Sequence, residues 1–270
     1  MVDIDKIVEN IRKKVKDAQG TIGIILSHCF SDFLEYVENK TEVYFKDVNL
    51  KVLGHDIEEN KFVFGSLYNK NIVVIIGRIH YSHGYECEDV ATPIYVLKEL
   101  GCQSLILCSS VGAINHKIKV GDVATLTDHI NFTGRNPLNA LNVNKYGHKF
   151  VDMIDPYDFS MIKTLEETAK KEMSIKVKKG VLVEFTGPSA ETVSETKFAH
   201  YIGADLVGFN ICNEVIAAKY CELPILSYSL VTNHASAFSN NKVKHEDIVY
   251  NRKCASTYYL ELLARFIKNL

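Results

Sequence analysis

The stretch GVLVEFTGPSAET, residues 180–192, decides the fold that the sequence predicts. Its first half, residues 180–185, reads as a buried strand, and a Gly-Pro-Ser turn then leads to Glu191 and Thr192. Ligands of open α/β sheets bind outside the carboxyl ends of the strands. We therefore expect Glu191 to lie beside a ligand.

A second strand further along the chain has the same arrangement. Residues 226–231 read as a buried strand, and Thr232 and Asn233 follow it. Each segment has an ordinary explanation when taken alone, because Gly-Pro-Ser is a common turn, a helix favours glutamate in its first turn, and asparagine is common in loops. Together they bring a carboxylate and a carboxamide to one edge of the sheet, which suits a heterocycle with both hydrogen-bond donors and acceptors.

The amino-terminal half of the chain contains residues that suit an anion. Residues 21–26 read as a buried strand that ends at Ser27, where we expect a helix to begin with unpaired backbone N–H groups. A predicted hairpin over residues 62–76 then places Arg78 and His80 at the exit of a strand. Arginine offers a planar fork of donors and histidine one further donor, so the composition of this loop indicates phosphate binding. The alternative is that His80 is a buried core histidine.

Strands alternate with helices along the whole chain, which predicts an α/β fold. Asp155 is expected to cap a helix that begins at Pro156. No linker rich in Pro, Gly or Ser divides the sequence. We therefore expect a single domain over residues 1–270, with a mixed, largely parallel central sheet flanked by helices on both sides. Other helices are expected over residues 3–18, 88–100, 192–202, 211–221 and 244–269.

The composition excludes several classes of protein. A net charge of -2 provides no broad field for nucleic acid or for an anionic membrane. No signal-like apolar core opens the chain and no run of about eighteen apolar residues occurs, so we expect a cytoplasmic protein. The seven cysteines lack CxxC spacing, which argues against a metal site or a disulfide framework. Any anion site must therefore be local.

Several ordered motifs resemble those of one enzyme family. They include Gly77 to His80, Asp128 to Asn131, Gly187 to Thr192, Gly203 to Gly208, Glu214 to Ala218, and Thr232-Asn233. From Thr21 to about His245 the chain is similar to the trimeric purine nucleoside phosphorylases, whose close relatives are the methylthioadenosine phosphorylases. The resemblance implies a homotrimer that uses inorganic phosphate as co-substrate and needs no metal or organic cofactor.

The resemblance also implies a role for individual residues, all numbered as in this sequence. Those implied for catalysis are Asn233, His80 and Glu191. Those implied for phosphate binding are Ser27, Arg78, His80, Ser110 and Asn210, the last at a position where the family has serine. Those implied for the purine are Glu191, Asn233, Phe209 and Phe185. Those implied for the ribose are Ser82, His245 and Phe150, the last from a neighbouring subunit.

The implied reaction is phosphorolysis of 6-oxopurine ribonucleosides or deoxyribonucleosides such as inosine and guanosine, in purine salvage. Asn233 favours these substrates, because relatives that act on methylthioadenosine have aspartate there. The family's glycine-rich first loop is replaced by Ser27 to Ser31, with no glycine. This altered loop leaves open two alternatives, a nucleosidase that uses water and a nucleoside-binding protein without activity. A methylthioadenosine phosphorylase, disfavoured by Asn233, is a third.

Overall fold

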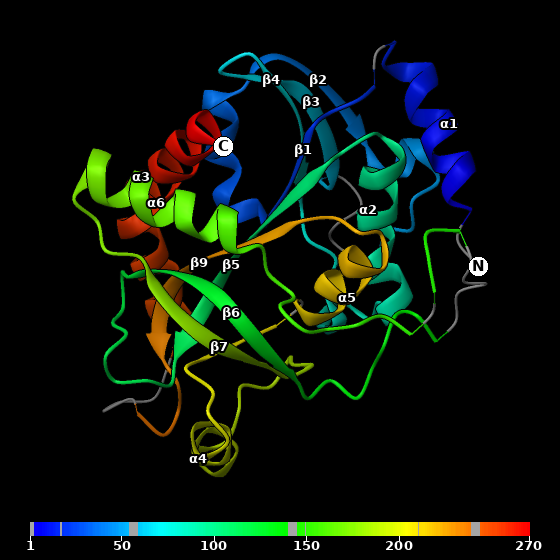
Figure 1. The fold of residues 1–270 in the computed structure, drawn as a ribbon. Helices are drawn as coiled ribbons and strands as arrows, with labels where there is room; N and C mark the ends of the chain where they lie inside the picture. Colours follow the sequence, from blue (N-terminus) through cyan, green and yellow to red (C-terminus); the bar gives the residue numbers. More distant parts are fainter. Residues whose placement is uncertain are drawn as a thin grey trace. The chain divides into compact units, whose positions relative to one another are not determined.

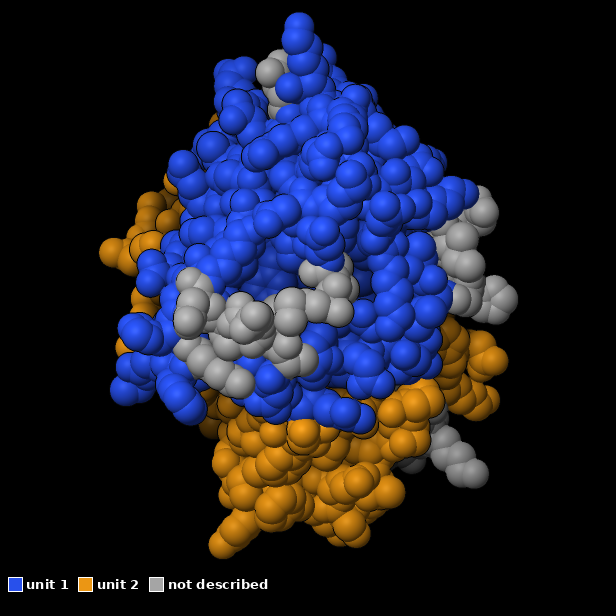
Figure 2. All heavy atoms as spheres, turned by 90° about the vertical axis from the view of Figure 1, so that its right-hand side faces the viewer, with its two compact units in different colours: residues 1–108, 135–154, 213–225 blue, residues 109–134, 155–212, 226–270 orange. Residues whose placement is uncertain are grey.

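The structure is a computed structural model, and it describes residues 3–16, 18–53, 59–139, 145–148, 150–209, 211–238 and 244–270. The contacts divide the chain into two compact units, coloured blue and orange in Figure 2. Unit 1 contains residues 1–108, 135–154 and 213–225, and unit 2 contains residues 109–134, 155–212 and 226–270. The single domain predicted over residues 1–270 stays a prediction.

Unit 1 contains strands in the order β2, β3, β4, β1, β5 (Figure 1). The central strand β1 is parallel to both β4 and β5, whereas β2, β3 and β4 are antiparallel neighbours. The predicted hairpin is confirmed: Tyr68 and Asn69 have φ of 50° and 63° in its turn, as two-residue hairpin turns require. The strands are β1 (Ile22–Leu26), β2 (Glu38–Tyr44), β3 (Lys61–Leu67), β4 (Lys70–Ile76) and β5 (Ser104–Ala113).

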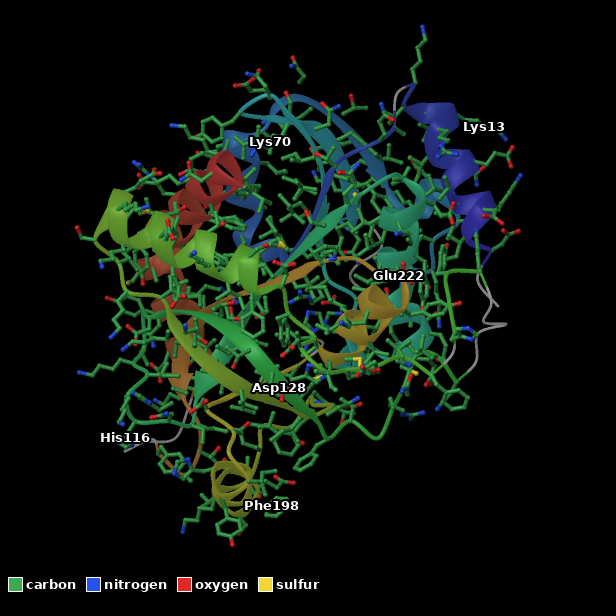
Figure 3. The ribbon with its side chains drawn as sticks, in the orientation of Figure 1. Lys13, Lys70, His116, Asp128, Phe198 and Glu222 are labelled. Atoms are coloured by element: carbon green, nitrogen blue, oxygen red, sulfur yellow. The ribbon has the colours of Figure 1, made fainter. Side chains whose placement is uncertain are left out.

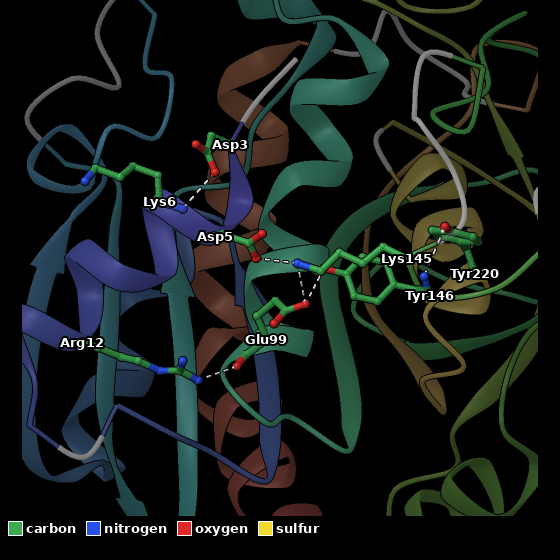
Figure 4. A network of polar contacts seen from close by, with 8 residues as sticks. All are labelled: Asp3, Asp5, Lys6, Arg12, Glu99, Lys145, Tyr146 and Tyr220. Carbon is green, nitrogen blue, oxygen red and sulfur yellow. Dashed lines mark hydrogen bonds and ion pairs between the residues drawn. The ribbon is translucent and has the colours of Figure 1, made fainter.

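The helices α1 (Ile4–Lys14), α2 (Cys87–Glu99) and most of α5 (Cys212–Tyr220) belong to unit 1. Helix α1 buries Ile7, Val8 and Ile11 and ends before the predicted Ala18. Polar contacts also link it to its surroundings (Figure 4). Nζ of Lys145 lies 2.5 Å from Oδ1 of Asp5 on α1 and 3.0 Å from Oε1 of Glu99 on α2. Short 3-10 helices also occur, namely η1 (His28–Tyr36), η2 (Phe45–Val48) and η4 (Tyr81–His83).

Unit 2 contains the second half of β5 and strands β6 (Val123–Asn131), β7 (Lys178–Glu184), β8 (Leu206–Gly208) and β9 (Ile225–His234). They follow the order β5, β8, β7, β6, β9, and β5 also pairs with β9. Strand β7 is parallel to β6 and β8, whereas β5 and β8 are antiparallel, as are β6 and β9. The sheet is therefore mixed, as predicted for the α/β fold.

The helices of unit 2 are α3 (Phe159–Met173), α4 (Val193–Tyr201) and α6 (His245–Asn269), and α3 packs on α6. The predicted start of α3 at Pro156 is wrong. Asp155 has φ of 48°, a left-handed conformation, so it does not cap the helix. Asp158 does so instead, because its Oδ1 accepts from the Met161 N–H at 2.8 Å. None of the described helices is long and apolar enough to cross a membrane.

Candidate active site

Arg78 follows strand β4 and is a buried cation of unit 1. The residue is 4% exposed, and its Nε donates to Oε1 of Glu214 on α5 at 3.0 Å. Its Nη2 atom is buried and has no hydrogen-bond partner among the described residues. A buried N–H without an acceptor is unfavourable, and a guanidinium pairs well with phosphate oxygens. Arg78 can therefore bind an oxyanion while Glu214 keeps the guanidinium in place.

Ser27 and Arg78 leave the sheet of unit 1 at the same edge. Strands β1 and β4 are parallel with Leu26 opposite Ile76, and the Gly77 N–H donates to the Leu26 carbonyl at 2.9 Å. Ser27 is half-buried at the start of η1, and its hydroxyl makes no capping hydrogen bond there. The backbone thus places both predicted phosphate-binding residues at neighbouring strand ends.

His80 is neutral near pH 7 in this environment. Burial, and after it the nearby Arg78, His83 and His28, lower its pKa from 6.5 to about 3. Its ring lies 5.5 Å from the ring of His83, centroid to centroid. A neutral imidazole has one donor and one acceptor, so His80 is able to donate a single hydrogen bond to an anion. Ser82 lies in the exposed turn η4.

Glu191 and Asn233, the predicted purine-binding residues, both belong to unit 2. Ser236, which follows shortly after Asn233, donates from Oγ to the Glu191 carbonyl at 2.7 Å. Asn233 is half-buried, accepts from Thr232 Oγ1 at 3.0 Å and donates to the His234 carbonyl at 3.2 Å. The segments that contain the carboxylate and the carboxamide therefore lie in contact.

Phe209 and Phe185 are the two aromatic residues predicted beside the purine. Phe209 is 36% exposed and lies beside the Gly-Pro-Ser turn, since a Cβ built on Gly187 would meet its ring at 3.5 Å. The ring of Phe185 lies 5.9 Å from that of Phe132. The turn itself contains a cis peptide bond between Gly187 and Pro188.

The remaining predicted residues differ in their surroundings. Ser110 is half-buried on β5, and His245 is exposed as the first residue of α6. Phe150 is 94% exposed. Asn210 lies outside the described residues. The roles predicted for all of these positions stay predictions.

Three buried polar residues were given no role in the sequence analysis. Glu214 is 2% exposed and pairs with Arg78. Glu184 is fully buried, and its Oε2 accepts from the Ile211 and Cys212 N–H groups at 2.6 and 2.5 Å. Asn60 is 1% exposed and contacts His28. A carboxylate inside an apolar segment was a signal for the two glutamates, whereas nothing in the sequence around Asn60 indicated burial.

Known proteins are similar to this chain over most of its length. The family model described as "Phosphorylase superfamily" matches residues 24–268. Purine nucleoside phosphorylase 1 of Bacillus subtilis is 31% identical over 247 residues, which cover 91% of either chain. The purine nucleoside phosphorylase of Mus musculus is 34% identical over 226 residues, 81% of this chain and 75% of the mouse protein.

Solved structures are similar over nearly the whole chain. The purine nucleoside phosphorylase of Schistosoma mansoni in complex with inosine has a TM-score of 0.92 and 28% sequence identity, and the match covers 99% of this chain and 96% of that chain. Isoform 2 of the same organism's enzyme, in complex with cytosine and ribose-1-phosphate, has a TM-score of 0.93 at 26% identity, with the same coverage of both chains.

Proposed function

The chain belongs to the purine nucleoside phosphorylases of the phosphorylase superfamily, and from this premise we propose that it cleaves 6-oxopurine ribonucleosides and deoxyribonucleosides with inorganic phosphate. The products are the free base and ribose 1-phosphate or its deoxy form. The observation that supports this most directly is the buried Arg78, which Glu214 orients and whose Nη2 lacks an acceptor.

The ligands of similar structures fit the two halves of this reaction. Schistosoma purine nucleoside phosphorylase has been solved with hypoxanthine, with inosine and with guanosine, and isoform 2 with ribose-1-phosphate. These compounds are a purine base, two 6-oxopurine nucleosides and a sugar phosphate. They support a nucleoside and phosphate as the substrates of this chain.

We assign the phosphate to Arg78, Ser27 and His80, together with Ser110. Phosphate attacks C1′ of the sugar as the bond from C1′ to N9 breaks, and the sugar develops positive charge. The bound anion is both nucleophile and counter-charge, so holding it in line with C1′ accounts for a large share of the rate. His80, neutral because burial and Arg78 depress its pKa, donates one hydrogen bond and leaves the phosphate charge available.

We assign the purine to Asn233 and Glu191, with Phe209 and Phe185 beside the base. The departing purine gains negative charge or a proton at N7. The Asn233 carboxamide hydrogen-bonds N7 and the 6-oxo group, and Glu191 accepts from N1–H. A group that binds more strongly in the transition state than in the ground state raises kcat. Asn233 is therefore the residue on which turnover depends most.

We also propose a homotrimer, in which Phe150 and His245 contribute to the ribose site as the family resemblance implies. An aromatic side chain that is 94% exposed, as Phe150 is, fits a residue covered by another subunit. The proposed reaction uses inorganic phosphate as co-substrate and calls for no metal or organic cofactor. The cytoplasmic location stays a prediction.

The decisive experiment follows release of hypoxanthine from inosine with and without inorganic phosphate. We expect turnover only with phosphate, and ribose 1-phosphate as the sugar product. Equal turnover without phosphate would instead establish a nucleosidase, and faster turnover of methylthioadenosine than of inosine would establish that the Asn233 argument is wrong. Binding of inosine with no cleavage in either condition would establish a binding protein.

A further inference from the structure

Asn60 is a buried carboxamide at the start of β3. It is 1% exposed, and its Oδ1 lies 2.7 Å from Nε2 of His28. Its backbone carbonyl accepts from the Phe45 N–H at 2.9 Å. The side-chain Nδ2 is buried and has no hydrogen-bond partner among the described residues. Buried donors almost always have an acceptor, so this amide N–H indicates a missing partner.

The register of the sheet places this carboxamide opposite the residue that precedes Arg78. Strands β3 and β4 are antiparallel with Lys61 opposite Ile76, so Asn60 lies opposite Gly77. Gly77 has φ of 96°, and a Cβ built on it would lie 1.9 Å from Asn60 Oδ1 and 2.7 Å from His28 Nε2. Only glycine leaves room for the two side chains. The residue after Gly77 is Arg78, whose Nη2 is likewise a buried donor with no partner among the described residues.

His28 fixes the carboxamide in one orientation. With Oδ1 facing the imidazole, the ring donates from Nε2 and the amide nitrogen points elsewhere. Nδ1 of the same ring lies 3.7 Å from a carboxylate oxygen of Glu59. His28 belongs to the first loop, Ser27 to Ser31, from which glycine is absent.

We propose that Asn60 is a further phosphate-binding residue: its Nδ2–H donates to an oxygen of the anion that Arg78 binds, and His28 positions it. This inference rests on the proposed function, because that function supplies the anion. A tetrahedral oxyanion has enough lone pairs to accept from Arg78, His80 and Asn60 together. A neutral amide adds a donor without adding positive charge. A further positive charge would instead lower the pKa of His80 still more.

The test compares Asn60→Ala and Asn60→Asp with the wild-type enzyme, with phosphate varied at saturating inosine and inosine varied at saturating phosphate. Loss of one hydrogen bond to a charged group is expected to raise the KM for phosphate about tenfold or more. Asn60→Asp is nearly the same shape but places a carboxylate beside phosphate, so its increase is larger. The KM for inosine stays within about twofold, because the purine is assigned to other residues, Asn233 and Glu191.

Tyr95→Phe is the matched control. Tyr95 is 2% exposed, belongs to unit 1, and its hydroxyl is also buried without a partner among the described residues. Removing that hydroxyl leaves both KM values unchanged. His28→Ala, which frees the carboxamide to rotate, raises the KM for phosphate less than Asn60→Ala does. A folded Asn60→Ala enzyme with wild-type KM for phosphate would overturn the proposal, as would equal increases in both KM values.

A second measurement covers the case in which the variants fold poorly. Inorganic phosphate is titrated into the ¹⁵N-labelled wild-type protein without nucleoside. The side-chain amide resonance of Asn60 is assigned as the one that is absent from the spectrum of Asn60→Asp. This assignment needs only a small amount of folded Asn60→Asp protein. We expect that resonance to shift with phosphate concentration, and an unmoved resonance overturns the inference. Absence of phosphorolysis with a shifting resonance would refute the proposed function alone.

Discussion

At the scale of the residue, Asn233 is held at both ends of its carboxamide. Oδ1 accepts from Thr232 Oγ1 at 3.0 Å, and Nδ2 donates to the His234 carbonyl at 3.2 Å. A Cβ on Gly112 would lie 3.0 Å from Nδ2, so glycine at that position gives the side chain its space. The amide is thus preorganised, which is the condition under which a donor stabilises a transition state most.

Asn233→Ala is expected to lower kcat for inosine by about 100-fold to 1000-fold, the usual effect of removing a donor aimed at developing charge. The KM for phosphate changes little, because the phosphate residues are unaltered. Steady-state kinetics with both substrates varied would measure the two effects. Asn233→Asp serves as the companion variant, and we expect it to gain activity on 6-aminopurine nucleosides. A kcat close to the wild-type value would remove Asn233 from the mechanism.

His80 makes stability depend on pH. Its folded-state pKa of about 3 lies below the ordinary 6.5, chiefly because of burial, so the unfolded chain binds a proton that the folded chain does not. The contribution is therefore fully present above pH 6.5 and is lost progressively as pH falls toward 3. Urea unfolding at pH 7 and pH 5 should show a smaller loss of stability for His80→Asn than for the wild-type protein. Equal losses in the two proteins would contradict the prediction.

At the scale of the element, a fully buried carboxylate controls how α5 begins. Glu184 ends β7, and its Oε2 accepts from the N–H groups of Ile211 and Cys212 at the helix start. The first N–H groups of a helix have no partner within the helix, and a negative charge there is favourable. Burial, and then Glu184 itself, raise the pKa of Cys212 well above its ordinary value, so that thiol stays protonated.

Glu184→Ala leaves these two buried N–H groups without an acceptor and should lower the free energy of unfolding by about 3 kcal/mol or more. Glu184→Gln keeps a carbonyl oxygen at the same place and should lose clearly less. Urea denaturation followed by circular dichroism would measure both. Phe209 lies directly before this helix start, so we also expect the alanine variant to raise the KM for inosine. An alanine variant as stable as the wild type would show that Glu184 does not hold the helix.

At the scale of the whole molecule, the proposed homotrimer needs apolar surface that another subunit can cover. Unit 2 presents an aromatic cluster in which the rings of Phe132 and Phe198 stack at 6.0 Å and Phe185 meets Phe132 edge on. Phe198, labelled on α4 in Figure 3, is 54% exposed, and Tyr201 on the same helix is 87% exposed. Exposed aromatic clusters of this kind are typical of interfaces.

Phe198→Glu is expected to shift the protein from trimer toward monomer, because the new carboxylate would be buried without a partner at the interface. Light scattering after size-exclusion chromatography would give the mass of each species. Lys13→Glu, on the exposed face of α1, is the control and leaves the mass unchanged. A wild-type protein that is monomeric at micromolar concentration would contradict the homotrimer and with it the role of Phe150.

The sequence by itself determined the α/β class, the hairpin before Arg78, and the order of motifs that identifies the family. These features are local, because the strand pattern, the turn residues and the motif spacing each depend on a short segment of the chain. Only the tertiary structure decided that Arg78 pairs with Glu214, that Asn60 contacts His28, and that Glu184 accepts from the N–H groups at the start of α5. Each of these contacts joins residues far apart in sequence, and their partners are chosen by strand register and burial. The wrong prediction of Asp155 as the helix cap has a related cause. Asp155 and Asp158 are both suitable caps by residue type. The backbone at Asp155 is left-handed in the fold, so Asp158 caps the helix instead.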